Sequence, residues 1–205
     1  TGIDENKFDI KKKSKITRQL LHIKENDFVM AITARIKNLR NKGHRDLLEM
    51  MHKYPAASHW HLLVIGKGKA LHKLKELADK YNLKNNIHCI GHVDNVEDYI
   101  QLADTVVLPS DFETFGLALA EGMMMGKAGV AYTIGGIPEI IENNINGFLV
   151  KYKDIDDLYH KLNELSANPQ LCKTMGKNAH KYIKEHFSCN YMMDKIEQVY
   201  NEFGV

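Results

Sequence analysis

Residues 105–133 read TVVLPSDFETFGLALAEGMMMGKAGVAYT, and this stretch decides the fold. Its short apolar run at 105–109 predicts a buried strand, residues 115–125 predict a helix that is apolar on all sides, and residues 129–133 predict a second buried strand. Strands without a polar face are typical of parallel sheets that helices cover on both sides. The stretch therefore predicts one strand–helix–strand unit of an α/β fold.

The same alternation continues on both sides of this stretch. Further strands are expected at 28–34, 60–65, 87–90 and 147–151, and further helices at 14–24, 44–54, 70–81, 95–103 (capped by Asp94), from Pro138, and at 155–166, 170–186 and 189–203. Six strands joined by helices predict a doubly wound, Rossmann-like parallel sheet with trailing C-terminal helices. A sheet of this kind binds its ligands beyond the carboxyl ends of its strands.

The composition is that of an ordinary soluble domain. The chain has 205 residues, of which 44% are hydrophobic and 26% charged, and its net charge is +2. This mild and dispersed charge gives no indication of a nucleic-acid partner, and the lysines at 11–13 are interpreted as a solvated face. No apolar run reaches the roughly 18 residues of a membrane span, and no signal-peptide pattern is present.

Cysteine usage and the first residue add two expectations. Cys89, Cys172 and Cys189 have neither metal-binding nor redox spacing, which favours a reducing, cytoplasmic compartment. Because the chain starts at Thr1 without an initiator Met, we interpret it as a fragment or a processed product.

Two glutamates of the first stretch are the strongest site candidates. Glu121 falls in the middle of the predicted apolar helix, where a buried carboxylate without a partner costs several kcal/mol or shifts its pKa. It therefore requires either a fixed protein partner or a ligand with hydroxyl groups. Glu113 lies in the loop before that helix, where backbone N–H groups favour anions. Together they predict a site for a polyol phosphate.

Other polar and glycine-rich positions also follow the expected strands and so fall at the same sheet edge. In chain order they are Arg35 and Lys42, Gly66 and Gly68, Gly91 and His92, Glu113, and Gly135 and Gly136. Two fixed cations such as Arg35 and Lys42 could hold a diphosphate, with Lys37 and Arg40 as competing cations. The backbone of Thr114, Phe115, Gly116 and Leu117 could bond phosphate or sugar oxygens at the helix start.

Three further motifs have simpler interpretations. The run at 66–68 (GKG) lacks the third glycine of a dinucleotide loop, which argues against a nicotinamide cofactor. Residues 154–156 (DID) spell a metal-holding DxD signature but open a helix, which favours an N-cap. His59 and His61 lack further metal ligands and are interpreted as ordinary surface or edge histidines. No motif in the chain requires a metal or another cofactor.

These motifs resemble the retaining glycosyltransferases of family 4, also called glycosyl transferase group 1, which have the two-lobed GT-B fold. The resemblance covers nearly the whole chain, and its most specific element is the E-x7-E segment at 103–127 (ADTVVLPSDFETFGLALAEGMMMGK). The other matching segments are 1–8 (TGIDENKF, a connection between lobes), 34–43 (ARIKNLRNKG, a phosphate loop with Ala34 where Gly is usual), 135–150 (GGIPEIIENNINGFLV) and 187–203 (FSCNYMMDKIEQVYNEF, a last helix).

The resemblance implies a role for each candidate residue. Glu113 would contact donor-sugar hydroxyls near the reacting carbon, and Glu121 would bond the ribose hydroxyls of the nucleotide. Arg35 and Lys42 would grip the diphosphate and stabilise it as a leaving group. The backbone around Thr114, Phe115, Gly116 and Leu117 would help to hold sugar and phosphate, and Gly91, His92 and Val93 would lie near the base.

Two departures from the family pattern concern the sugar. Thr114 stands where Gly is common, and the usual Gly-x-Pro-Val after the helix reads GKAG at 126–129. Neither removes a proposed polar contact, but both leave the choice of sugar open.

The resemblance also implies that the N-terminal, acceptor-binding lobe is absent from this chain. Residues 1–27 would form the connection between lobes with a leading helix, residues 28–186 the nucleotide-sugar-binding domain, and residues 187–205 a C-terminal helix that packs toward the absent lobe. The implied activity is transfer of a sugar from a UDP- or GDP-linked donor to a glycan or lipid-linked acceptor, as in polysaccharide biosynthesis.

Two alternatives stay open. The isolated chain is expected to be inactive alone, so one alternative is a nucleotide-sugar-binding module without turnover. The other is a GT-B nucleotide-sugar epimerase. A cytoplasmic enzyme is expected, and any peripheral association with the inner face of the membrane would involve the absent lobe. The base, sugar, acceptor, linkage and oligomeric state stay open.

Overall fold

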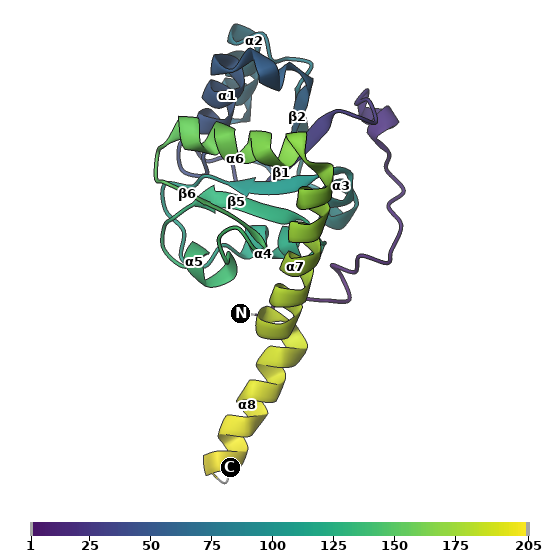
Figure 1. Cartoon of the computed structure of the whole chain (residues 1–205), viewed down its shortest axis with the longest axis vertical. Helices are drawn as coiled ribbons and strands as arrows, with labels where there is room; N and C mark the ends of the chain where they lie inside the picture. Colours follow the sequence, from purple (N-terminus) through teal and green to yellow (C-terminus); the bar gives the residue numbers. More distant parts are fainter. Residues whose placement is uncertain (1, 204–205) are drawn as a thin grey trace.

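A parallel sheet of six strands forms the centre of the computed structural model, which describes residues 2–203 (Figure 1). The strands lie in the order β3-β2-β1-β4-β5-β6. Their bounds are Phe28–Thr33 (β1), Trp60–Ile65 (β2), Ile87–Gly91 (β3), Thr105–Leu108 (β4), Ala128–Tyr132 (β5) and Gly147–Val150 (β6). This order confirms the predicted doubly wound sheet. Thr1 and residues 204–205, at the ends of the predicted lobe connection and last helix, lie outside the described residues.

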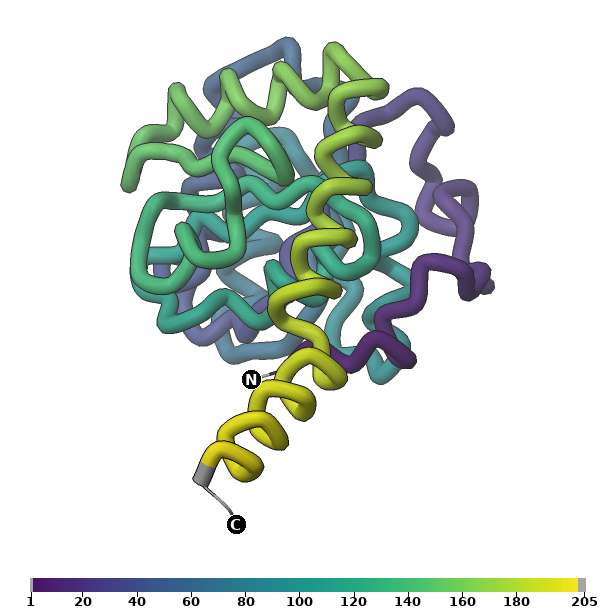
Figure 2. The backbone as a smooth tube through the Cα atoms, turned by 60° about the horizontal axis from the view of Figure 1, so that its bottom comes forward, coloured from purple at the N-terminus to yellow at the C-terminus, as the bar shows by residue number. Residues whose placement is uncertain are grey.

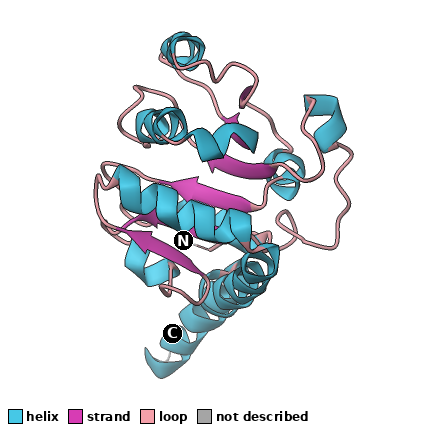
Figure 3. Ribbon diagram, turned by 45° about the horizontal axis from the view of Figure 1, so that its top comes forward, coloured by secondary structure: helices cyan, strands magenta, loops and turns pink. Residues whose placement is uncertain are grey.

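Helices cover both faces of the sheet (Figure 3). The helices α1 (His44–Lys53), α2 (Leu71–Lys80) and α6 (Ile155–Ala167) bury their apolar residues in one core cluster, whereas α3 (Val96–Leu102), α4 (Leu117–Met124) and α5 (Ile137–Ile140) contribute to the other. A short 3-10 helix, η2 (Pro55–His59), joins α1 to β2. In β1, Met30 packs in the first cluster and Val29 in the second, because successive side chains of a strand point to opposite faces.

Two long helices end the chain. The first, α7 (Pro169–Phe187), crosses from one core to the other, since Met175 lies in the first cluster and Ile183 in the second. The second, α8 (Cys189–Phe203), projects away from the sheet (Figures 1 and 2). It carries an exposed apolar stripe that consists of Met193, Ile196, Val199 and Tyr200. Within residues 2–203, this stripe packs against no core cluster.

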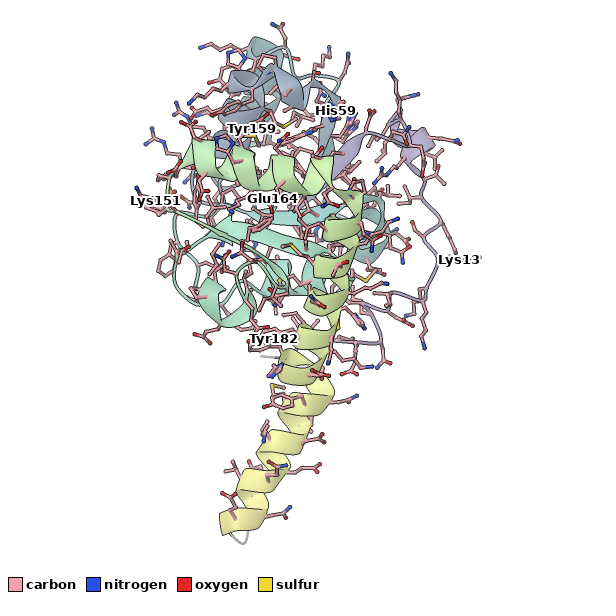
Figure 4. All side chains as sticks on the ribbon, in the orientation of Figure 1. Lys13, His59, Lys151, Tyr159, Glu164 and Tyr182 are labelled. Atoms are coloured by element: carbon pink, nitrogen blue, oxygen red, sulfur yellow. The ribbon has the colours of Figure 1, made fainter. Side chains whose placement is uncertain are left out.

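The segment before β1 corrects one prediction. The helix expected at 14–24 is wrong, because only a 3-10 turn, η1 (Arg18–Leu21), forms there. The Ser14 hydroxyl accepts from the Ile16 N–H and donates to the Ile16 carbonyl, and Thr17 is extended, so local polar bonds compete with the helix. The segment instead passes along the outside of the domain, where Lys13 is labelled in Figure 4.

Two smaller expectations about helix starts are also wrong. Asn95 rather than Asp94 occupies the N-cap position of α3, and it makes no capping bond to the helix backbone. The helix expected from residue 115 begins at Leu117, because Gly116 adopts a left-handed backbone with φ of 97°.

Candidate functional site

The candidate site lies at the carboxyl edge of the sheet, where the strand order reverses. Strand β1 pairs with β2 on one side and with β4 on the other, so the loops that follow β1 and β4 leave the sheet side by side. These loops span 34–43 and 109–116 and carry most of the residues singled out from the sequence. A reversal of strand order of this kind opens the crevice in which doubly wound folds bind ligands.

Lys42 and Glu113 meet between these two loops. The Lys42 amine donates to Glu113 Oε2 at 2.6 Å, and the two side chains are 29% and 13% exposed. The loops are held together by backbone as well, since the Asp111 N–H donates to the Asn41 carbonyl at 3.0 Å. Gly43 makes this approach possible, because a Cβ at this position would lie 2.0 Å from the Pro109 carbonyl oxygen. The geometry therefore fixes a cation beside a carboxylate that keeps its second oxygen available.

The loop after β5, which contains Gly135 and Gly136, packs against the backbone of Glu113 and Thr114. Gly135 has a φ of 48°, and a Cβ added there would lie 1.7 Å from the Glu113 carbonyl oxygen. The Gly136 N–H donates to the Thr114 carbonyl at 3.1 Å. The glycine pair that the sequence placed at the sheet edge thus positions Glu113 through its main chain.

A polar network of two buried and two partly exposed side chains also holds the loop that carries Glu113. The Lys153 amine pairs with Asp111 and lies 3.5 Å from Asp46 Oδ2, which also accepts from the Tyr132 hydroxyl at 2.8 Å. Burial, together with the bond to Asp46, raises the pKa of Tyr132, which stays protonated as a donor. Sequence reasoning missed this network, because its members are scattered over more than one hundred residues and share no motif.

Arg35 lies on the same edge but is not brought into contact with Lys42. Its side chain is exposed and forms no ion pair within the described part of the chain. The loop beneath it is rigid, because Ile36 is fully buried and its N–H donates to the Lys67 carbonyl at 3.1 Å. A Cβ at Gly68 would lie 2.2 Å from the Ile36 carbonyl oxygen, so the GKG run supports the Arg35 loop and does not form a dinucleotide loop.

Of the three residues expected near a base, Gly91 ends β3, and His92 and Val93 follow it. The Gly91 carbonyl accepts from the Gly66 N–H at 2.7 Å, which ties this loop to the one after β2. His92 is exposed, and Val93 is half-buried against the second core cluster. The structure therefore places this loop at the same edge, two strands away from the Lys42–Glu113 pair.

The start of α4 is open to solvent. Gly116 caps it without a side-chain bond, so the first N–H groups of the helix lack the usual capping acceptor. Thr114 is exposed, Leu117 is 41% exposed, and Phe115 packs edge-on against Phe187 with ring centroids 5.3 Å apart. Phe115 is therefore a packing residue.

Glu121 lies one turn further along α4. The helix is not buried on all sides as expected, because Leu117, Ala118 and Glu121 form a stripe that is only partly covered. Glu121 makes no hydrogen bond or ion pair to any side chain within residues 2–203. Partial burial raises the pKa of its carboxyl above the ordinary value, and the nearby charge of Lys7 opposes that shift. The protein partner that the sequence left as one alternative is not found among these residues.

Two histidines near the strands have opposite surroundings. His44, the first residue of α1, is fully buried, and neither of its ring nitrogens has a partner within the described residues. Burial, aided by the charge of Lys42, lowers its pKa to about 4. His61, expected at the surface, is instead buried in the interior strand β2, where it contacts Asp27 at 3.1 Å and His88 at 2.9 Å.

The remaining sequence motifs are structural in this chain. Asp154 caps α6 by accepting from the Asp157 N–H at 2.9 Å, which confirms the N-cap interpretation of the DID run. Over residues 2–203, no three His, Cys, Asp or Glu side chains lie together as metal ligands would. Nor does that part of the chain contain a helix long and apolar enough to cross a bilayer.

Comparison with known proteins gives a consistent family. The model of "Glycosyl transferases group 1" matches residues 13–182. N-acetyl-alpha-D-glucosaminyl L-malate synthase of Bacillus anthracis is 26% identical over 170 residues, covering 82% of this chain and 45% of that protein. The Escherichia coli UDP-Gal:alpha-D-GlcNAc-diphosphoundecaprenol alpha-1,3-galactosyltransferase is 25% identical over 207 residues, covering all of this chain and 53% of that protein.

The solved structures agree with the observed fold. Anabaena Alr3699/HepE in complex with UDP superposes with a TM-score of 0.85 at 22% identity, over 98% of this chain and 56% of that one. The chain thus spans about half the length of the proteins that it resembles.

Proposed function

The chain belongs to the glycosyl transferase group 1 family, and we propose that it is the donor-binding lobe of a retaining glycosyltransferase whose donor is a uridine-diphosphate sugar. Its sheet and trailing helices form one lobe of a GT-B fold. The nucleotide is inferred from two relatives: one solved structure holds UDP, and the Escherichia coli enzyme is named for a UDP-galactose donor. The sugar and the acceptor of this protein stay open.

Lys42 and Arg35 are proposed to bind the diphosphate. Lys42 is fixed at the reversal of strand order, and Arg35 has no ion-pair partner within the described residues to compete with a phosphate. The open N-terminus of α4 adds backbone N–H donors and a favourable dipole on the opposite side of the crevice. A diphosphate at this position would compete with Glu113 for the Lys42 amine, and the second oxygen of Glu113 would face the donor sugar.

The observation that carries the proposal is Glu121. A partly buried carboxylate without a hydrogen-bond partner is costly in a helix that is otherwise apolar. Two vicinal hydroxyls, such as those of a ribose, would satisfy both of its oxygens. Its position on α4, one turn beyond the proposed phosphate-binding N–H groups, suits a nucleotide that runs along the helix.

The chemistry then follows from the charges. Departure of the nucleoside diphosphate leaves an oxocarbenium-like sugar, and the fixed cations stabilise the charge that develops on the leaving group. An acceptor hydroxyl attacks the same face, assisted by a donor phosphate oxygen. Glu113 orients the sugar hydroxyls near the reacting carbon, and the loops behind it preserve that geometry.

Residues 28–186 are proposed to hold the donor, and the two ends of the chain are proposed to join a second lobe. The N-terminal segment meets the end of the chain where α7 passes into α8, because the Ile3 N–H donates to the Phe187 carbonyl at 2.8 Å and the Ile3 carbonyl accepts from the Cys189 N–H at 2.9 Å. The exposed stripe of α8 offers an apolar surface on which an acceptor-binding lobe could pack. That lobe would also carry any contact with the inner face of the cytoplasmic membrane.

Two other functions are compatible with this site. The isolated chain could bind nucleotide sugar without turnover, which transfer to any acceptor by this chain would contradict. A GT-B epimerase would convert the donor without an acceptor, and a product assay on the full-length protein would reveal it. The cation–carboxylate pair at the strand reversal suits either reaction, so the product decides between them.

The melting temperature of this chain with UDP, GDP, ADP and their sugars tests the proposal. A ligand at 100 times its Kd adds about 2.7 kcal/mol, which corresponds to roughly 5–10 °C at this size. We expect such a shift with UDP ligands, and its loss in Glu121→Ala. Glu185→Ala, which changes an exposed carboxylate on α7, is the matched control and should keep the shift. A shift in Glu121→Ala equal to the wild type would contradict the assignment.

A further inference from the structure

A second group of cations lies beside the donor site, along a groove between α2 and residues 38–41 of the loop that leads into α1. The groove has a volume of about 690 Å³, and Arg40, Arg45, Lys73 and Lys80 line it. Only Arg45 among them has an ion-pair partner in residues 2–203, Glu49 Oε1 at 2.5 Å. Three cations without a paired carboxylate therefore surround one concave surface, and this arrangement favours an anionic occupant.

The other polar groups of the groove are suited to hydroxyls. Glu76 from α2 lies among the cations, and Tyr81 stands at the end of that helix, where its ring stacks on His52 with centroids 4.3 Å apart. The loop at 38–41 forms one rim of the groove. Its shape is fixed locally, because the Asn38 side-chain oxygen accepts from the Arg40 N–H at 3.0 Å and the Asn41 N–H at 2.8 Å. A carboxylate, a phenol and amides between cations favour a ligand that carries hydroxyls as well as negative charge.

The charge distribution of the whole chain supports the same conclusion. Residues 1–91 contain 19 Lys and Arg against 9 Asp and Glu, whereas residues 92–205 contain 9 against 17. The net charge of +2 therefore hides a strong asymmetry, and the expectation of a dispersed charge is wrong. The half of the sheet that contains β1, β2 and β3 is the basic side, because residues 28–91, which include these strands, contain 12 Lys and Arg against 4 Asp and Glu. The groove lies on the basic side, which would attract an anion over long range.

We propose that this groove between α2 and the loop at 38–41 binds a soluble polyol-phosphate chain, next to the nucleotide-sugar site but through different side chains. Lysines act as point charges for phosphate, and Glu76, Tyr81 and the amides of the rim accept or donate to hydroxyls. The rim also includes Asp111, which pairs with Lys153 and lies two residues before Glu113, so an occupant would touch the loop that carries the donor-site carboxylate.

Binding of a short, soluble poly(glycerol phosphate) tests this proposal by titration calorimetry and by chemical-shift changes. Lys73→Glu with Lys80→Glu reverses two charges in the groove, and Lys75→Glu with Lys84→Glu makes the same change at exposed positions outside its lining. We expect at least about tenfold weaker binding in the groove variant and less than about threefold in the control. Both variants should keep the wild-type melting temperature and UDP affinity, whereas Lys42→Ala should lose UDP and keep the polymer.

The remaining outcomes overturn the proposal. Equal losses in the two charge-reversal variants would mean that the basic side attracts anions without a specific site. Absence of wild-type binding at low salt would exclude the site outright. Binding to vesicles of anionic phospholipid but not to the soluble polymer would assign the groove to a membrane surface. Because UDP affinity is measured separately, failure here is distinguishable from failure of the donor-site proposal.

Discussion

Charged residues lie at both edges of the β1–β4 pair, but protein partners bond those at the amino edge far more completely than those at the carboxyl edge. At the amino edge, the Arg18 guanidinium donates to the carbonyls of Leu102, Glu25 and Asp27 at 3.0 Å and to Asp104 Oδ1 at 2.9 Å. The second Asp104 oxygen accepts from the Val29 N–H at 2.8 Å. At the carboxyl edge, Lys42 and Glu113 share one contact, and neither Arg35 nor Glu121 has an ion-pair partner within residues 2–203.

This difference separates a structural site from a binding site. A cation such as Arg18, with four of its five N–H donors bonded to protein oxygens, stabilises the fold and has little capacity left for a ligand. A cation or carboxylate that is held in place but incompletely bonded costs free energy until a ligand completes it. The same pair of strands therefore uses charge for stability at one edge and, by our proposal, for substrate at the other.

The largest expected effect is on catalysis. Lys42→Ala in the full-length enzyme should lower kcat/KM by roughly 100- to 1,000-fold, because the diphosphate loses a fixed cation as charge develops on it. The free energy of unfolding should change by less than about 1 kcal/mol, since the pair is partly exposed. Lys37→Ala, an exposed lysine of the same loop, is the control and should keep near-normal activity. A near-normal Lys42→Ala enzyme would remove this lysine from the site.

The amino edge should give the opposite result. Arg18→Ala should lower the free energy of unfolding by about 3 kcal/mol, because several carbonyls and the Asp104 carboxylate lose their donor together. Donor affinity should stay within about twofold of the wild type, since the residue lies at the other end of the strands. Denaturant unfolding and UDP titration measure the two quantities, and Lys24→Ala is an exposed control nearby. Loss of UDP affinity without loss of stability would contradict the comparison.

The sequence predicted which residues lie at the carboxyl edge better than it predicted their contacts. Strands apolar on both faces and glycine-rich loops placed Lys42, Glu113 and Gly135 at one edge, because the carboxyl ends of parallel strands meet there. Capping chemistry identified Asp154, since a cap needs only local sequence.

The predictions that were wrong or missing concern residues whose contacts lie far apart in the sequence. The segment at 14–24 has helical periodicity, yet Arg18 is held by residues from 25 to 104, which no local pattern contains. The Lys153 network depends likewise on residues that only the folded sheet brings together. The partial exposure of Glu121 follows from how α4 is seated on the sheet, and the apolar sequence of that helix gives no signal of it.

A pH series tests the carboxyl edge through the buried His44. His44 at the carboxyl edge has a pKa of about 4 because it is buried without partners, whereas the unfolded chain takes up its proton near pH 6.5. The unfolded state therefore binds more protons between these values, and stability falls as pH decreases. The histidine alone should cost about 2 kcal/mol between pH 7 and pH 5.

His44→Leu isolates this contribution. The variant should unfold with a shallower pH dependence over that range, and it should match or exceed the wild-type stability at pH 7, because two unpartnered ring nitrogens are removed. His88, whose pKa burial and the neighbouring His61 lower to about 4, should retain its own share of the slope. Identical slopes in wild type and His44→Leu would show that this ring has partners in solution.

The smallest effect concerns the support of the carboxyl edge. Lys153 joins Asp111 to Asp46, so Lys153→Ala should loosen the Glu113 loop without removing any group that touches the donor. We expect kcat of the full-length enzyme to fall by roughly 3- to 10-fold with KM for the donor nearly unchanged, and Lys153→Arg to restore most of it. Lys151→Ala, on the turn after β6 (Figure 4), is the control. A purely structural role would lower the melting temperature and leave kcat intact at low temperature. That result would place Lys153 with the amino-edge residues, as a group that the fold needs and the reaction does not.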